Sequence, residues 1–188
     1  MTQTRTRTTH AHTAIDDALV AKAAGGDEAA LALIYDTYAR DIYRYHYSRV
    51  GNVPDAEDLT AQTFMAVLEV LPSYQPRGLF RAWIFRISYQ KLMDYYRQQK
   101  HLAVQISPEI PVLEEKLDGV IQDQAQELLA ALFEALPEAE RELIRLRYLV
   151  GLTYAEIGMV LGRKEDAVRK RLNRLLVRLH DQMEVQNG

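Results

Sequence analysis

The sequence predicts an all-α protein built from two small helical domains joined by a linker. Apolar residues recur three and four positions apart through most of the 188-residue chain, which is the spacing of one helix face. No segment shows the apolar–polar alternation of a half-buried strand. Residues 101–123 hold two Pro and one Gly without periodicity, which is typical of a linker.

The chain divides into four expected parts. Residues 1–14 carry six Thr with scattered Arg and His and no apolar periodicity, so we expect a disordered tail. A first domain then covers residues 15–100. The linker covers residues 101–123, and a second domain covers residues 124–183.

The composition excludes several classes of protein. Apolar residues make up 48% and charged residues 26%, as in ordinary globular chains. The absence of Cys excludes disulfides and thiolate metal sites. No apolar run has the length of a signal peptide or a membrane span, so we expect a cytoplasmic protein without membrane insertion. His10 and His12 lack further ligands nearby, and we expect no metal or other cofactor.

Helix starts and stops are marked in the first domain. Asp16 or Asp17 caps a short helix that ends at Ala24, before two glycines. Asp27 caps the next helix. This helix carries five Tyr between residues 35 and 47, most of which we expect in the core.

A third helix is expected from Asp55 to about Leu71, after a loop that contains Pro54. Its first turn holds three carboxylates, including Asp58. Two interpretations stay open: the acids stabilise the helix start through its dipole, or they contact a basic partner. No nucleophile accompanies them at a useful spacing, so acid–base catalysis is not indicated.

Aromatic and basic residues interleave in the next segment. The Pro- and Gly-containing loop at residues 72–78 includes Tyr74, and a helix is expected over residues 80–99. We expect its Ile and Leu residues on one face, with Phe80 and Trp83 on another. Aromatic rings beside cations suit stacking on unpaired bases together with phosphate contacts. The alternative is that Trp83 is simply a core residue.

The second domain is expected to begin with a helix from about Asp123 to Ala135. Pro137 starts another helix, which Gly151 ends. Its expected core positions are Leu143, Ile144, Leu146 and Tyr148.

Residues 151–179 have the pattern of a helix-turn-helix. Thr153 and Glu156 form a capping-box signature, and Gly162 separates the first helix from a longer one. The apolar stripe of the longer helix comprises Val168, Leu172, Leu175 and Leu179. Basic residues lie between the stripe positions, as in a helix that enters the major groove.

The basic and polar residues of this helix and of the turn before it fall into two expected groups. The base-edge candidates, on the face opposite the stripe, are Arg169, Lys170, Asn173 and Arg174. The phosphate candidates are Arg163, Lys164, Arg171 and Arg178. For each of them the alternative is a solvated basic residue without a DNA role.

Charge is unevenly distributed along the chain. Residues 163–178 hold seven Lys or Arg and two acids, a net charge of +5. Because the whole chain sums to −3, the remainder sums to −8. Phosphate neutralisation dominates DNA affinity, so we expect this protein to need a partner in order to bind DNA well.

Several stretches resemble bacterial RNA polymerase sigma factors of the sigma-70 family, in the extracytoplasmic-function (ECF) subgroup. They read DAEDLTAQTF (55–64), PRGLFRAWIFRIS (76–88), ALPEAERELIRLRYLVGLTYAEIGMVLG (135–162) and AVRKRL (167–172). Their order and spacing match the family. The resemblance implies an alternative sigma factor that directs promoter-specific transcription initiation and is not an enzyme.

The resemblance also implies a role for each half. The first would bind the clamp helices of core RNA polymerase and melt the −10 element; the second would bind the flap of the other large subunit and read the −35 element. The implied polymerase contacts are Asp55, Asp58 and Gln62. The implied −10 contacts are Tyr74, Phe80, Arg81, Trp83, Arg86 and Tyr89, beside a loop that captures a flipped base. Promoter DNA and an anti-sigma factor are the further partners implied.

Other classes of protein explain less of the chain. If the protein were a stand-alone helix-turn-helix regulator, the interleaved aromatic and basic residues of the helix expected over residues 80–99 would have no explanation. A decoy that only sequesters an anti-sigma factor should lack Trp83, Arg169 and Arg174, which are all present. An enzyme would need a nucleophile–base pair, a phosphate loop or a metal cluster, and the sequence shows none of them.

Overall fold

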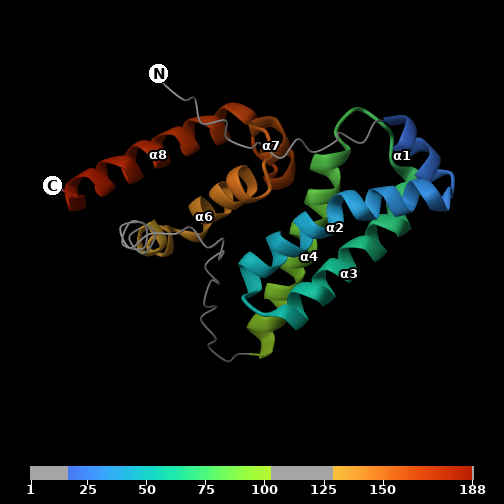
Figure 1. Ribbon diagram of the computed structural model, residues 1–188, viewed down its shortest axis with the longest axis horizontal. Helices are drawn as coiled ribbons and strands as arrows, with labels where there is room; N and C mark the ends of the chain where they lie inside the picture. The colour runs from blue at the N-terminus through green and yellow to red at the C-terminus, as the bar shows by residue number, and fades with distance from the viewer. Residues whose placement is uncertain (1–16, 103–128, 188) are drawn as a thin grey trace, which may run out of the picture.

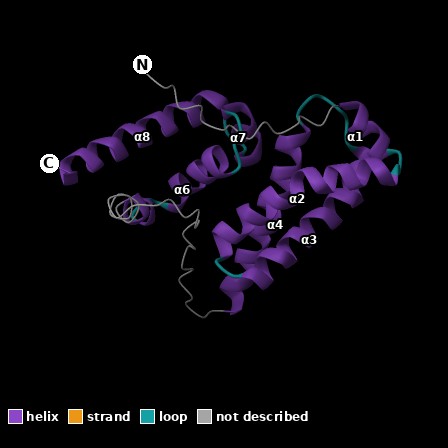
Figure 2. Ribbon diagram, viewed as in Figure 1, coloured by secondary structure: helices purple, strands orange, loops and turns teal. Residues whose placement is uncertain are grey.

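The computed structural model describes residues 17–102 and 129–187, and within these ranges the protein is helical with no strand (Figures 1 and 2). This confirms the all-α prediction. The predicted tail lies outside the described residues, as does the linker from residue 103 onward. The α-helices are α1 (Asp17–Ala24), α2 (Glu28–Val50), α3 (Val53–Val70), α4 (Phe80–Leu102), α6 (Glu138–Ile144), α7 (Tyr154–Leu161) and α8 (Glu165–Asn187).

Local capping sets the helix ends that the sequence predicted. The Asp27 side chain accepts a hydrogen bond from the backbone N–H of Ala30 at 2.9 Å and so caps α2. Thr153 and Glu156 form a complete capping box at the start of α7. Gly162 ends α7 in the left-handed conformation, with φ 64°, which glycine adopts without a steric penalty.

One predicted helix boundary was wrong. Helix α3 begins at Val53 rather than Asp55, because the Asn52 side chain caps it and Pro54 lies in the first turn. A proline is tolerated there because the first N–H groups of a helix have no intrahelical partner. Helix α8 continues to Asn187.

The chain between α6 and α7 contains a π-helical turn, η2 (Arg145–Leu149). The backbone N–H of Val150 bonds to the carbonyl of Arg145, five residues back, at 3.0 Å. This wider turn shifts the side chains that follow it around the helix axis. Tyr148, which lies within this turn, is 53% exposed, and Val150, directly after it, is buried. The prediction that Tyr148 is a core residue was wrong, whereas Leu143 and Leu146 are buried as expected.

Helices α2, α3 and α4 pack together as the body of the first domain (Figure 1). Of the five Tyr in α2, Tyr38 and Tyr45 are buried, Tyr43 and Tyr47 are half-buried, and Tyr35 is exposed. The ring of Tyr35 still contacts Phe64, with centroids 4.7 Å apart. The core interpretation therefore holds for most of them.

The two halves share one apolar core. Buried residues of the second half, among them Leu146, Leu152 and Ile157, belong to the same cluster as the core of α1 to α4. Helix α7 lies beside α4, and α8 extends away from the first domain toward the C-terminus (Figure 1). Within the described ranges, no helix has the length and apolarity needed to cross a membrane.

Candidate nucleic-acid and polymerase interface

Helices α7 and α8 form the predicted helix-turn-helix. Gly158 of α7 lies against the turn, and its carbonyl accepts a hydrogen bond from the N–H of Arg163 at 2.8 Å. The four stripe residues of α8 are all buried, as predicted: Val168, Leu172, Leu175 and Leu179. Burial of this stripe fixes which face of α8 is presented to solvent.

The four base-edge candidates lie on the exposed face of α8. Arg169, Lys170, Asn173 and Arg174 are all exposed. Arg169 pairs with Asp166 one turn earlier, and the Nε of Arg174 donates to the carbonyl of Lys170 at 3.3 Å. These are weak exposed contacts that DNA can replace, so the face is available to a ligand.

The four phosphate candidates do not form one group. Lys164 is exposed at the start of α8. Arg171 and Arg178 both turn toward Glu140 of α6, Arg171 at 3.7 Å and Arg178 more closely. Arg163 lines a cavity between the two halves, and Arg171 lines it as well. Phosphate contact by these residues stays a prediction.

Three aromatic rings meet at the loop before α4. The centroid of Tyr74 lies 4.6 Å from that of Trp83 and 5.4 Å from that of Phe80. Tyr74 and Trp83 are half-buried, while Phe80 is only 2% exposed. Phe80 was wrongly expected on a face away from the core; it packs beneath the other two rings and supports them. Tyr74 and Trp83 offer a partly open aromatic surface.

The other predicted −10 residues lie along α4. Arg86 is exposed. Arg81 donates to the backbone carbonyls of Val150 and Gly151, the latter at 3.2 Å. Tyr89 is half-buried and lines the same cavity as Arg163. In this arrangement, Arg86 is therefore the basic −10 candidate that faces solvent.

The acidic residues at the start of α3 do not all have the same surroundings. One of them stabilises the helix start, and another is available to a basic partner. Asp55 accepts hydrogen bonds from the Tyr95 hydroxyl at 2.6 Å and from Asn52 at 2.8 Å, so it has a structural role. Burial, and then the hydrogen bond to Asp55, raises the pKa of the Tyr95 hydroxyl. Asp58 accepts from Gln62 at 2.6 Å, and both residues are exposed.

An exposed apolar residue continues the Asp58–Gln62 face. Met65 is 63% exposed and lies one turn beyond Gln62 on α3. Leu68, one turn further along α3, is 52% exposed, and adjacent exposed apolar residues bordered by polar ones can mark a protein interaction surface. The sequence alone does not single out Met65, because methionine is most often a core residue.

Two family models match the chain: Sigma-70 region 2 over residues 34–102, and Sigma-70, region 4 over residues 126–179. The chain is 34% identical to the ECF RNA polymerase sigma factor SigE of Mycolicibacterium smegmatis. This match spans 167 residues, which make up 84% of this chain and 64% of SigE. It is 31% identical over 176 residues to SigD of Mycobacterium tuberculosis, covering 89% of this chain and 83% of SigD. The chain belongs to the ECF sigma factors of the sigma-70 family.

A solved structure is also similar. The structure of CnrH in complex with the cytosolic domain of CnrY matches with a TM-score of 0.66 and 25% identity, over 90% of this chain and 97% of that chain. The described residues contain no group of three or more side chains that could together hold a metal ion.

The two sigma domains meet through a buried polar network of Tyr45, Arg49 and Glu142. Glu142 of α6 accepts from the Tyr45 hydroxyl at 2.5 Å and from Arg49 at 2.7 Å, both on α2. The side chains of Arg49 and Glu142 are each 6% exposed. Burial, and then the adjacent Glu142 carboxylate, raises the pKa of Tyr45 well above its ordinary value, so its hydroxyl stays a donor.

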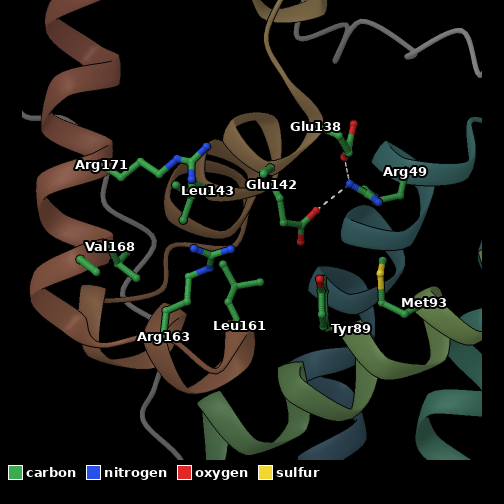
Figure 3. A pocket seen from close by; sticks show the side chains of 12 residues that line it. Arg49, Tyr89, Met93, Glu138, Glu142, Leu143, Leu161, Arg163, Val168 and Arg171 are labelled. Carbon is green, nitrogen blue, oxygen red and sulfur yellow. Dashed lines mark hydrogen bonds and ion pairs between the residues drawn. The ribbon is translucent and has the colours of Figure 1, made fainter.

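A second acid extends this contact. Glu138 pairs with Arg49 across the interface and with Arg145 of its own domain, the latter at 2.8 Å. Burial, and then the neighbouring Arg49, lowers the pKa of Arg145 to about 10. Beside the network lies a cavity of about 270 Å³. Figure 3 shows Arg49 between Glu138 and Glu142, with Tyr89 on the opposite wall from Arg163 and Arg171.

A buried histidine joins the three long helices of the first sigma domain. The Nε2 of His46 lies 3.1 Å from the hydroxyl oxygens of both Thr63 and Ser88. All three side chains are buried, so no substrate reaches this Ser–His pair. Burial, and then the positive charge of Arg49, lowers the pKa of His46 to about 3.

Proposed function

We propose that this chain is an alternative sigma factor that binds core RNA polymerase and directs promoter-specific transcription initiation. In this proposal, the exposed face of α8 reads the −35 element. The loop before α4 captures a −10 base on Tyr74 and Trp83 and helps to melt the duplex. The observation that carries the proposal is the presence of two separate DNA-suited surfaces on one chain: a basic major-groove helix and a partly open aromatic pair.

The polymerase contacts belong to the same proposal. The exposed Asp58–Gln62–Met65 face of α3 would bind the clamp helices of core polymerase, and the second domain would bind the flap. Asp55 would hold the start of this face in place through Asn52 and Tyr95. The protein would act in the cytoplasm, where bacterial core polymerase works.

An anti-sigma factor is a further proposed partner. The related structure holds CnrH together with the cytosolic domain of CnrY. We infer that a protein of the same kind binds this chain.

A run-off transcription assay tests the proposed function. Core polymerase and this protein would be incubated with a pool of genomic fragments, and the transcript starts would be sequenced. We expect starts downstream of shared −35 and −10 sequences that core polymerase alone does not use. A stand-alone regulator or a decoy would give no new starts without another sigma factor, and that outcome would overturn the proposal.

A matched pair of variants tests the aromatic surface. Trp83→Ala should abolish the new starts on duplex promoters but preserve them on templates that are already unpaired across the −10 element, because the ring is needed only to hold the melted state. Tyr43→Phe, which alters an aromatic residue of α2 outside both proposed DNA surfaces, should leave both templates active.

A further inference from the structure

The short helix α1 is joined to the loop that carries Tyr74. The Asp17 carboxylate, in the first turn of α1, accepts a hydrogen bond from the backbone N–H of Gly78, whose nitrogen lies 3.0 and 2.9 Å from its two oxygens. These two residues are 61 positions apart in the sequence. An N–H group makes a shorter and stronger bond to a charged carboxylate than to a neutral acceptor.

Helix α1 is itself held by the core of the first domain. Its residues Val20 and Ala23 are 0% and 3% exposed and belong to that core. It packs against α2 and against the 3-10 turn η1 (Leu71–Ser73), which directly precedes Tyr74 (Figure 1). The Asp17 carboxylate therefore projects from a fixed support.

The loop after Tyr74 has few buried contacts of its own. Residues 75–79 are all exposed, and the side-chain bond from Arg77 to Gln75, at 2.7 Å, is exposed as well. Gly78 has φ 68°, a left-handed conformation that glycine adopts without strain. An exposed segment of this kind opens easily, so a bond from Gly78 to a fixed helix has a large effect on its conformation.

Asp17 lies near the aromatic pair as well as near the loop backbone. Burial, and then the charge of Asp17, raises the pKa of the Tyr74 hydroxyl. The Tyr74 ring in turn contacts Trp83, and Phe80 supports both rings. A loop held at Gly78 therefore keeps the Tyr74 ring against Trp83 before any DNA binds.

We propose that Asp17 is a positioning residue for capture of the −10 base, because it holds Gly78 and so keeps Tyr74 beside Trp83. This role rests on the sigma-factor function proposed above. The loop is ordered before DNA binds, so the cost of ordering it does not reduce the affinity for the base. The carboxylate itself does not contact DNA, since its negative charge repels phosphates.

Variants of Asp17 test this role from the side of α1. Asp17→Ala removes both acceptor oxygens, whereas Asp17→Asn keeps one acceptor oxygen in a side chain of nearly the same size. The matched control is Glu28→Ala, which removes an exposed acid from the first turn of the neighbouring helix α2.

Variants of Gly78 test the same contact from the side of the loop. Gly78→Val places a β-branched residue where φ is positive, which distorts the loop. Gly78→Asn is its control, because Asn tolerates the left-handed conformation. A Cβ at this position would meet open space, so the two variants differ through the backbone conformation rather than through a clash.

Fluorescence of Trp83 reports the aromatic pair directly, because the chain has no other Trp. We expect Tyr74 to shield the Trp83 ring from acrylamide in wild type, in Glu28→Ala and in Gly78→Asn. Asp17→Ala and Gly78→Val should raise the quenching constant, and Asp17→Asn should lie between wild type and Asp17→Ala. Thermal melting identifies the variants that keep the wild-type fold.

Base capture is measured with holoenzyme and a single-stranded −10 probe. The probe is the non-template strand of a promoter found in the run-off assay, either intact or with one base removed at each position in turn. Removal of the captured base should weaken wild-type binding roughly tenfold. In Asp17→Ala this ratio should fall to roughly twofold, with partial recovery in Asp17→Asn, because the ring no longer waits in place. A general loss of stability would weaken binding of all the probes alike and leave the ratio unchanged.

An unchanged ratio in Asp17→Ala would overturn the role of Asp17 and leave the sigma-factor proposal standing. Unchanged quenching of Trp83 in the same variant would also overturn it. Should Asp17→Ala fail to fold, Gly78→Val with its Gly78→Asn control gives the same two measurements. If the wild-type chain starts no transcription, the proposed function is wrong, and the role of Asp17 in base capture falls with it even where quenching shows that the loop is held.

Discussion

At the scale of single residues, His46 is a group whose protonation depends strongly on folding. Its ring is buried among α2, α3 and α4, near the positive charge of Arg49, so the folded protein holds it neutral. An unfolded chain would protonate it near its ordinary pKa of about 6.5. Neither its burial nor its partners Thr63 and Ser88 were evident from the sequence, which shows a histidine among tyrosines.

We predict that His46 makes the protein less stable as the pH falls. Between pH 6.5 and about 3, the unfolded state binds one proton at this residue and the folded state does not. The free energy of unfolding therefore falls by up to about 1.4 kcal/mol per pH unit. Urea unfolding at pH 7, 6, 5 and 4 would show a steeper pH dependence for wild type than for His46→Asn. Parallel curves would contradict the shift in pKa.

Variants of Arg174 and Lys164 would distinguish a contact with a base from a contact with a phosphate. Both are exposed: Arg174 lies on the base-edge face of α8, and Lys164 lies directly before the first residue of this helix. In holoenzyme, Arg174→Ala should cost about 1–3 kcal/mol and relax the preference at one base pair, whereas Lys164→Ala should weaken all sequences alike. Competition between cognate and scrambled −35 duplexes measures this difference. If Arg174→Ala lowers the affinity for both duplexes equally, Arg174 does not contact a base edge.

At the scale of elements, the helix-turn-helix depends on a glycine within α7. A Cβ at Gly158 would lie 2.6 Å from the backbone carbonyl oxygen of Arg163, closer than such atoms approach. Backbone atoms of a tight turn have little room to move, so α7 and α8 would have to separate. The sequence marked Gly162 as the helix break, but the need for a small residue at Gly158 follows only from the packing.

We predict that Gly158→Ala destabilises the second domain by about 1–3 kcal/mol, since overpacking outweighs the higher helix propensity of Ala. Binding of holoenzyme to the −35 element should weaken in parallel. Ala155→Ser, on the exposed side of the same helix, should change stability by less than about 0.5 kcal/mol. Chemical denaturation measures both, and a Gly158→Ala variant as stable as wild type would show that the turn can adapt.

At the scale of the whole molecule, positive charge is concentrated in α8 and the residues just before it, whereas the rest of the chain is acidic. Residues 163–178 carry +5 and the remainder carries −8. Part of the basic charge is neutralised within the fold, because Arg171 and Arg178 pair with Glu140. A duplex therefore meets only a small basic patch on an acidic protein.

The isolated protein should bind −35 duplex no better than roughly 10⁻⁴–10⁻⁶ M at physiological salt, the range of non-specific binding. Core polymerase should make binding tight and specific. Fluorescence anisotropy with and without core polymerase measures this. Sequence-specific binding near 10⁻⁸ M by the protein alone would refute the charge argument.

The sequence by itself determined the helix caps, the buried stripe of α8 and the chemistry of the exposed side chains proposed to face DNA. Caps such as Asp27 and Thr153 act within four residues, and the stripe from Val168 to Leu179 follows from helical spacing. These are local rules, so the chain shows them directly. Family motifs added the roles of the two halves.

Only the tertiary structure decided how the halves meet. Tyr45 and Glu142 are separated by 97 residues, and Arg49 and Glu142 by 93. The exposure of Tyr148, the core position of Phe80 and the pairing of Arg171 with Glu140 likewise depend on what packs against each residue. Helical periodicity says which side chains share a face. It does not say which distant charge that face will meet, because such contacts depend on the packing of whole helices rather than on neighbours in the chain.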